Sequence, residues 1–226
     1  MAKKISRKEL LKGPDEFMTL SERAAAFVQG HMKQISAVGI ALGVACIVYL
    51  GTTWYLGYSE RRGQEAYNKA YYTLRNAEAA GEGIQDPTLP MSLFQQVTEE
   101  HGLAKVSDLA LTQLAYLKFQ EGRHDEAISL YRAFQSEVPD RSKYQDMARL
   151  ALGACYEAKK EYGSAVEELQ PLAENKESPL RQQAMLSLIR IYKLEQNTEK
   201  ADEILSTFGE DYPDSPFLAF AQSLVQ

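Results

Sequence analysis

The chain has 226 residues, of which 45% are apolar and 25% charged, a length that accommodates one membrane segment and one domain of ordinary size. Its net charge of −6 is uneven, because residues 1–33 hold seven Lys/Arg and four Asp/Glu, a charge of +3, which leaves −9 for the remainder. An acidic body argues against nucleic acid as the main partner, since duplex binding requires clustered Lys/Arg to neutralise phosphates.

Residues 1–34 are expected to form a basic tail that contains a short amphipathic helix. Thr19 and Glu22 have the spacing of a capping box. Apolar residues then recur at helical intervals, at Ala24, Phe27, Val28 and Met32. The pattern predicts a helix that lies on the membrane surface or serves as a docking segment.

Residues 35–58, ISAVGIALGVACIVYLGTTWYLGY, contain no charged residue. As a helix rising about 1.5 Å per residue they would extend roughly 36 Å, enough to cross a hydrocarbon core of about 30 Å with some tilt. Tyr49, Trp54, Tyr55 and Tyr58 crowd the C-terminal end, where aromatic rings favour the headgroup level. We therefore predict a single transmembrane helix over this range.

Two other interpretations of the apolar segment fit less well. A cleaved signal peptide has an apolar core of about 7–15 residues close to the N-terminus, whereas here 34 residues precede a longer core. A lipoprotein signal ending at Cys46 is disfavoured because Leu42 lies one place too far from the cysteine and the chain stays apolar for twelve residues beyond it. The segment favours a retained anchor.

The Lys/Arg residues on either side of residues 35–58 predict opposite orientations of the helix in the membrane, depending on how far from the helix they are counted. Counted within about 20 residues, Lys/Arg are more numerous after the span than before it, whereas counting the whole N-terminal tail reverses the balance. We expect the N-terminus in the cytoplasm and the larger domain on the other side of the membrane. The inverted topology is the alternative.

Gly39 and Gly43 form a G-x-x-x-G pair within the apolar segment. This spacing lets two helices approach closely in lipid, so the two glycines are a predicted membrane-helix contact.

Two later segments of the chain repeat one another: LTQLAYLKFQEGRHDEAISLYRAFQSEVP (Leu111–Pro139) and MLSLIRIYKLEQNTEKADEILSTFGEDYP (Met185–Pro213). In each, a small residue follows the turn (Ala127, Ala201), a large apolar residue comes four places later, and a proline ends the second helix. Between them, RLALGACYEAKKEYGSAVEELQPL places Gly153 and Ala165 in the corresponding positions.

This pattern resembles the tetratricopeptide repeat, a helix–turn–helix unit of about 34 residues marked by L-G-x-x-Y, A-x-x-x-F and P. The resemblance implies an all-α fold in which a transmembrane helix precedes a tetratricopeptide-repeat-like solenoid. We expect a divergent helical pair over 59–107, repeats over about 108–141, 146–179 and 182–215, and a capping helix over 216–226. Ser178–Pro179 and Ser215–Pro216 are predicted to begin helices as N-cap and first-turn proline.

The concave face of such a solenoid is lined mainly by the first helix of each pair. The predicted groove residues are Leu109, Thr112, Tyr116, Phe119, Met147, Leu150, Glu157, Leu186, Arg190 and Lys193. Any one of them can instead pack as core against the neighbouring pair. Thr112 and Tyr116 stand where carboxylate-clamping repeats carry Lys and Asn, so we expect an apolar groove for extended or partly folded chain.

Catalytic and metal chemistry have no matching pattern. The chain lacks a nucleophile–base set and a phosphate-binding loop, and zinc needs about four Cys/His ligands at short spacing, whereas His31, His101 and His124 are scattered. We expect no enzyme activity, no cofactor, no metal and no small-molecule substrate. His101 and His124 are predicted to lie in exposed loops, Cys155 to be a buried hydrophobe, and Glu99–Glu100 and Glu167–Glu168 to be solvated.

The order of parts resembles the YfgM-type ancillary subunits of the bacterial Sec translocon. The resemblance rests on the tail, the anchor, a helical pair beginning near Gly63-Gln-Glu-Ala-Tyr67, and degenerate repeats. It implies a membrane-anchored chaperone or accessory factor of the bacterial inner membrane, with its N-terminus in the cytoplasm and its repeat domain in the periplasm. The implied partners are translocon subunits, a membrane-anchored prolyl isomerase and exported chains. Tyr212-Pro-Asp-Ser-Pro216 is more similar to repeats of cell-envelope assembly proteins, so the alternative is a structural adaptor that scaffolds such a complex.

Overall fold

The computed structural model describes residues 16–79, 86–138 and 143–225, with side chains described from residue 22. Ten helices lie in these ranges. The chain divides into two units, Met1–Tyr55 and Leu56–Gln226, which are considered separately.

The first unit contains α1 (Glu16–Gly30) and the beginning of α2 (Met32–Ala79). The apolar stretch of α2 is long and apolar enough to cross a membrane, and residues 32–58 are exposed throughout. Exposed leucine, isoleucine, valine and aromatic side chains therefore cover this surface of the helix.

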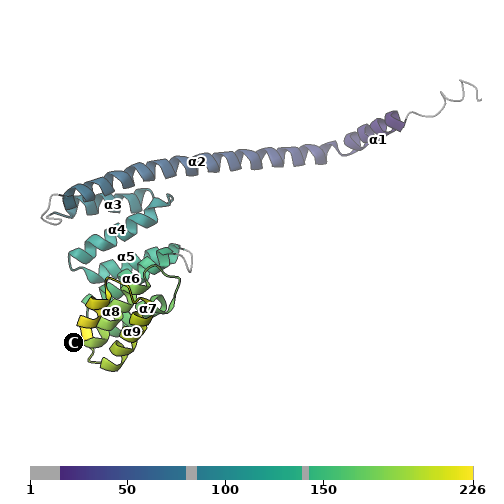
Figure 1. Ribbon diagram of the computed structural model, residues 1–226. Helices are drawn as coiled ribbons and strands as arrows, with labels where there is room; N and C mark the ends of the chain where they lie inside the picture. The colour runs from purple at the N-terminus through teal and green to yellow at the C-terminus, as the bar shows by residue number, and fades with distance from the viewer. Residues whose placement is uncertain (1–15, 80–85, 139–142, 226) are drawn as a thin grey trace, which may run out of the picture. The chain divides into compact units, whose positions relative to one another are not determined.

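The second unit begins with the last part of α2 and continues as a succession of antiparallel helices. Each helix from α3 to α9 packs against the next, and α10 packs against α8 and α9 (Figure 1). Their bounds are α3 (Thr88–Glu100), α4 (Val106–Gln120), α5 (His124–Glu137), α6 (Lys143–Ala158), α7 (Tyr162–Glu174), α8 (Arg181–Leu194), α9 (Thr198–Asp211) and α10 (Leu218–Val225). The predicted all-α fold is confirmed.

The turns within the helical pairs α4–α5, α6–α7 and α8–α9 have one geometry. Each places a single residue in the left-handed region: Gly122 at φ 76°, Lys160 at φ 63° and Gln196 at φ 60°. The recurrence of this left-handed conformation at each turn indicates that all three pairs are built in the same way.

Small residues stand where the two helices of each pair cross. Ala127, Ala165 and Ala201 are all fully buried. Gly153 of α6 is tighter still, because a Cβ built there would lie 2.6 Å from Cγ of Leu169 on α7. The helices can pack this closely only because no side chain stands between them.

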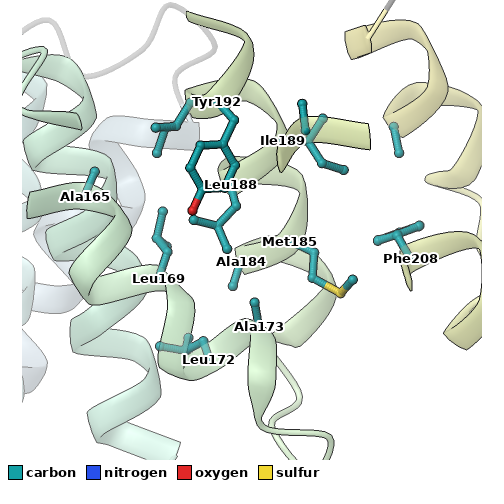
Figure 2. Packing of buried hydrophobic residues seen from close by; sticks show 13 residues of the cluster. Ala165, Leu169, Leu172, Ala173, Ala184, Met185, Leu188, Ile189, Tyr192 and Phe208 are labelled. Atoms are coloured by element: carbon teal, nitrogen blue, oxygen red, sulfur yellow. The ribbon is translucent and has the colours of Figure 1, made fainter. Parts of the chain in front are cut away.

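The largest buried cluster joins α7, α8, α9 and α10. Figure 2 shows Leu169 of α7 and Phe208 of α9 on opposite sides of α8, whose Met185, Leu188 and Ile189 fill the space between. Each of these five side chains is at most 1% exposed. Two smaller clusters continue this core toward the N-terminus, one joining α2, α3 and α4 and the other joining α4, α5 and α6.

In the first turn of α6 and of α8, a buried polar side chain donates hydrogen bonds to backbone carbonyls at the end of the preceding helix. The amide of Gln145 donates to the carbonyls of Gln135 (2.8 Å) and Val138 (3.1 Å). Arg181 Nε donates to the carbonyl of Ala173 (2.7 Å), and its Nη2 donates to Asp211 (2.6 Å). The bonds to Gln135, Val138 and Ala173 supply partners for carbonyls at helix C-termini, where intrahelical partners run out.

The two Ser-Pro sequences do not begin helices as predicted. Helix α8 begins at Arg181 and α10 at Leu218, so each serine lies in the turn before the helix. Ser178 Oγ accepts the N–H of Leu180 and donates to Asp146 of α6, and Ser215 Oγ makes the equivalent bonds to Phe217 and to Gln182 of α8. The serines therefore act as links between successive repeats, which a capping rule applied to one helix does not reveal.

The close crossing of α6 and α7 predicts the effect of a single methyl group. Gly153→Ala should lower the free energy of unfolding by about 1–3 kcal/mol, because the new Cβ would force Leu169 out of place. Thermal unfolding of the full chain in detergent, followed by circular dichroism, measures the change.

Gly163→Ala is the matched control. Gly163 lies in the first turn of α7, it is exposed, and a Cβ there would meet nothing within 4 Å. This variant should be stabilised by about 0.5–1 kcal/mol, because alanine loses less backbone entropy in a helix. Equal effects of the two substitutions would show that the crossing is not the constraint.

Candidate functional site

A groove between α4 and α6 is the most apolar concavity that we find in the described chain. It consists of two adjoining hollows of about 440 Å³ and 320 Å³ that share Tyr116, Tyr131, Met147 and Ala151. We call it the α4–α6 groove. Its lining residues are Thr112, Gln113, Tyr116, Phe119, Tyr131, Phe134, Met147, Ala148, Leu150, Ala151, Ala154, Cys155 and Leu180.

The two walls of the α4–α6 groove come from first helices of neighbouring repeats. Tyr116 and Phe119 extend from α4, and Met147 and Leu150 from α6, at the helical spacing of three that places each pair on one face. Tyr131 of α5 contributes the buried floor, with 8% of its surface exposed. Met147 is 50% exposed and Tyr116 37%, so apolar surface remains available in the groove.

The α4–α6 groove is electrically neutral. None of its lining residues is a Lys, Arg, Asp, Glu or His. Burial raises the pKa of the Cys155 thiol to about 11, and burial also raises the pKa of the Tyr131 hydroxyl, so both groups are protonated at neutral pH. The groove therefore favours uncharged ligands, since a charged group placed there would lose water without gaining a counter-ion.

Five of the ten predicted groove residues lie together in this lining: Thr112, Tyr116, Phe119, Met147 and Leu150. The other five lie outside it. Leu109 is half-buried, with its carbonyl accepting the hydroxyl of Thr112, and Leu186 packs against the buried α7–α10 cluster.

The predicted charged lining residues are paired within the chain. Arg190 of α8 binds both carboxylate oxygens of Glu157 of α6, at 2.5 Å from Nε and 2.7 Å from Nη2. Lys193 donates to the carbonyl of Val225 at the end of α10 (2.6 Å). The first contact joins two successive repeats and the second joins α8 to α10, so these three predicted groove residues are engaged in contacts within the chain.

Sequence reasoning missed the contribution of second helices to the groove. Tyr131 and Phe134 of α5 both line it, as does Leu180 from the turn before α8. A signal was present, because Tyr131 follows Ala127 by one helical turn and so lies on the same inward face. Cys155 is buried as predicted, at 1% exposure, and its place in the groove was not foreseen.

Two predictions about polar residues were wrong. Glu168 is 5% exposed and pairs with Arg132 at 2.6 Å and Arg149 at 3.5 Å, because α5, α6 and α7 converge there; Glu167 is exposed as expected. His124 begins α5 and is half-buried, with its ring against Phe119 at 5.2 Å between centroids.

Two larger hollows have a different character. One of about 630 Å³ is bordered by Asp146, Arg149 and Glu177, and one of about 620 Å³ by Lys118, Arg123, Asp125 and Glu126. In the second, the charges are already paired, since Glu126 binds both Lys118 and Arg123. Within the described residues we find no group of three or more His, Cys, Asp or Glu placed to hold a metal ion.

Gly39 and Gly43 lie on the exposed apolar stretch of α2. A Cβ built at either position would meet nothing within 4 Å. No described part of the chain occupies the space beside these glycines, so this side of α2 is open to another helix.

Comparison with known families identifies the repeated unit. The tetratricopeptide repeat family matches residues 109–141 and 183–215. The chain contains tetratricopeptide repeats. The matched segments contain α4–α5 and α8–α9, and the intervening α6–α7 pair has the same turn geometry. Repeats of this kind form protein–protein interaction modules.

A search of curated proteins found no match to the chain.

The burial of Cys155 predicts low thiol reactivity. At pH 8 a pKa of about 11 leaves roughly one thiol in a thousand ionised, against roughly one in ten at the ordinary pKa. In a Cys46→Ala chain, alkylation of Cys155 by iodoacetamide should therefore be about 100-fold slower in the folded protein than in urea. Mass spectrometry of timed samples measures both rates, and similar rates would contradict a buried, protonated thiol.

Proposed function

We propose that this protein is a membrane-anchored binding module that takes up uncharged, apolar segments of exported chains in the α4–α6 groove. The observation that carries the proposal is the groove itself, an open and apolar channel without a charged lining residue. The apolar stretch of α2 supports the membrane location. The repeats support a protein as the ligand.

The side chains that line the groove favour binding with low sequence specificity. Tyr116, Phe119 and Tyr131 offer aromatic surface, and Met147 offers a flexible thioether that adapts to side chains of different shape. Contacts of this kind depend on apolar area and little on sequence order. Such a groove suits a factor that meets many different chains, and it requires no catalytic group.

We further propose that the binding module works beside the Sec translocon. In this arrangement the N-terminus lies in the cytoplasm and the repeats in the periplasm of a bacterial inner membrane. The partners would be translocon subunits, a membrane-anchored prolyl isomerase and emerging chains. The order of tail, anchor and repeats supports this placement through its resemblance to YfgM-type subunits.

A second candidate is favoured by a different surface. Phe217 and Phe220, beside and within α10, are 47% and 49% exposed. Terminal helices of solenoids usually present a polar outer face, so exposed phenylalanines there favour a fixed protein contact. That contact would make the chain a structural adaptor in a cell-envelope complex.

Photo-crosslinking from the groove tests the main proposal. A benzoylphenylalanine at position 116 or 119 of the full chain should trap a broad set of exported precursors in intact cells. Ala133 is the control position, because it is exposed on α5 and lies outside the groove lining. A lack of precursors, or equal capture from position 133, would overturn groove binding.

The same experiment separates the adaptor from the binding module. A probe at Phe220 that traps a few stoichiometric partners, with none trapped at 116 or 119, would establish the adaptor.

Protease accessibility tests the orientation. In spheroplasts, protease added outside should digest the repeat domain and leave the N-terminal tail intact, because we place only the repeats in the periplasm. Immunoblotting with tags at the two ends of the chain gives the readout. Protection of the repeats until the membrane is permeabilised would establish the inverted topology.

A further inference from the structure

The loop between α3 and α4, His101–Lys105, packs on α2 just beyond the apolar segment. The backbone N–H of Lys105 donates to Glu60 Oε2 at 2.9 Å. Gly63 lies beneath the same loop, where an added Cβ would overlap Ala104 and lie 3.3 Å from Cβ of His101. Contacts at Glu60 and Gly63 thus fix the position of the loop along α2.

That position lies close to the membrane surface if α2 is the proposed anchor. Tyr58 is the last aromatic residue of the apolar segment, at the level where such rings meet the headgroups. At about 1.5 Å per residue, Glu60 and Gly63 follow Tyr58 by roughly 3 Å and 7.5 Å along the helix. The headgroup layer is about 5–7 Å thick on each side of the bilayer, so the loop falls within or against it.

The loop exposes one large apolar side chain. Leu103 is 64% exposed, although both Ala104 and Val106 are buried against the body of the protein. The buried neighbours hold the loop in place, and the leucine projects from it. In water an exposed leucine has no energetic advantage, whereas transfer of its side chain to an apolar environment gains roughly 1.5–3 kcal/mol.

Three basic residues lie in the loop or between its two contact points on α2. Arg61, Arg62 and Lys105 are all exposed, and none forms a salt bridge with a residue that the structure describes.

The nearby carboxylates are already engaged. Glu60 accepts the loop N–H, and Glu99 and Glu100 accept from Gln95 and Gln96 one turn earlier along α3. These donors are neutral and leave the carboxylates charged, so binding to an anionic surface depends on the exposed Arg61, Arg62 and Lys105.

We propose that the loop His101–Lys105 is a second membrane contact, in which Leu103 enters the headgroup region and Arg61, Arg62 and Lys105 bind lipid phosphates. The contact rests on the proposed anchor, because α2 brings the loop to the bilayer. An exposed apolar side chain accompanied by cations without ion pairs is the combination that interfacial segments use on anionic lipid. The contact adds a fixed point to a domain otherwise attached by one helix.

Depth-dependent quenching in vesicles tests this contact with the full-length chain. A Leu103→Cys variant in a Cys46→Ala, Cys155→Ala background would carry an environment-sensitive nitrobenzoxadiazole label. The protein would be reconstituted into phosphatidylethanolamine–phosphatidylglycerol vesicles with and without brominated acyl chains. Trp54, the one tryptophan in the sequence, reports insertion of the anchor in the same sample.

Leu89→Cys provides the matched control label. Leu89 is 58% exposed, similar to Leu103, but it lies at the opposite end of α3, about 18 Å away along the helix axis. We expect brominated lipid to cause a loss of emission from Trp54 and from the label at 103, with the label at 89 unchanged. Arg61→Gln with Arg62→Gln should reduce the loss at 103 and leave the loss at Trp54 intact.

Each other outcome overturns a stated part of the inference. Quenching of Trp54 without quenching at 103 would refute the loop contact and leave the anchor standing. No quenching at Trp54 would refute the anchor and the loop contact with it. Equal quenching at 89 and 103 would indicate general adsorption of the domain and would also refute a specific loop contact.

Discussion

Close helix crossing is the constraint on which the repeat architecture depends. Each helical pair brings two backbones together over an alanine, and in the α6–α7 pair a glycine brings them closer still. This approach fixes the angle between the helices, and the left-handed turn residue then returns the chain in the same direction each time. The α4–α6 groove is a product of this repetition, because it lies between equivalent helices of successive repeats.

Charged side chains form ion pairs between helices, and the lining of the α4–α6 groove contains no charged residue. Glu157 with Arg190 and Glu168 with Arg132 join helices of different repeats, and Arg181 with Asp211 joins the two helices of the α8–α9 repeat. Pairing of a partly buried charge is required, because an isolated one would be strongly destabilising. Since these residues bind each other, the acidic composition of the chain does not appear in the groove lining.

The fold could be predicted from the sequence because its determinants are local and periodic. Ala127, Ala165 and Ala201 mark the crossings in each repeat, and the uncharged stretch from 35 to 58 predicts the long apolar helix. The site was predicted only in part. Lining positions were assigned from the first helices alone, so Tyr131 was missed, and Arg190 was assigned to an open surface although it pairs with a residue 33 positions earlier. Such pairings depend on how one repeat stacks on the next, and no local pattern encodes that.

The neutrality of the α4–α6 groove has a consequence for the conditions in which it can work. Attraction between charges weakens as salt rises, because ions screen it over about 10 Å at 0.1 M. A groove that binds through Tyr116, Phe119 and Met147 has no such dependence, and kosmotropic salts strengthen apolar contacts of this kind. Under the proposed function, the affinity would therefore be set by the exposed apolar area of the ligand and would not fall through screening as ionic strength rises.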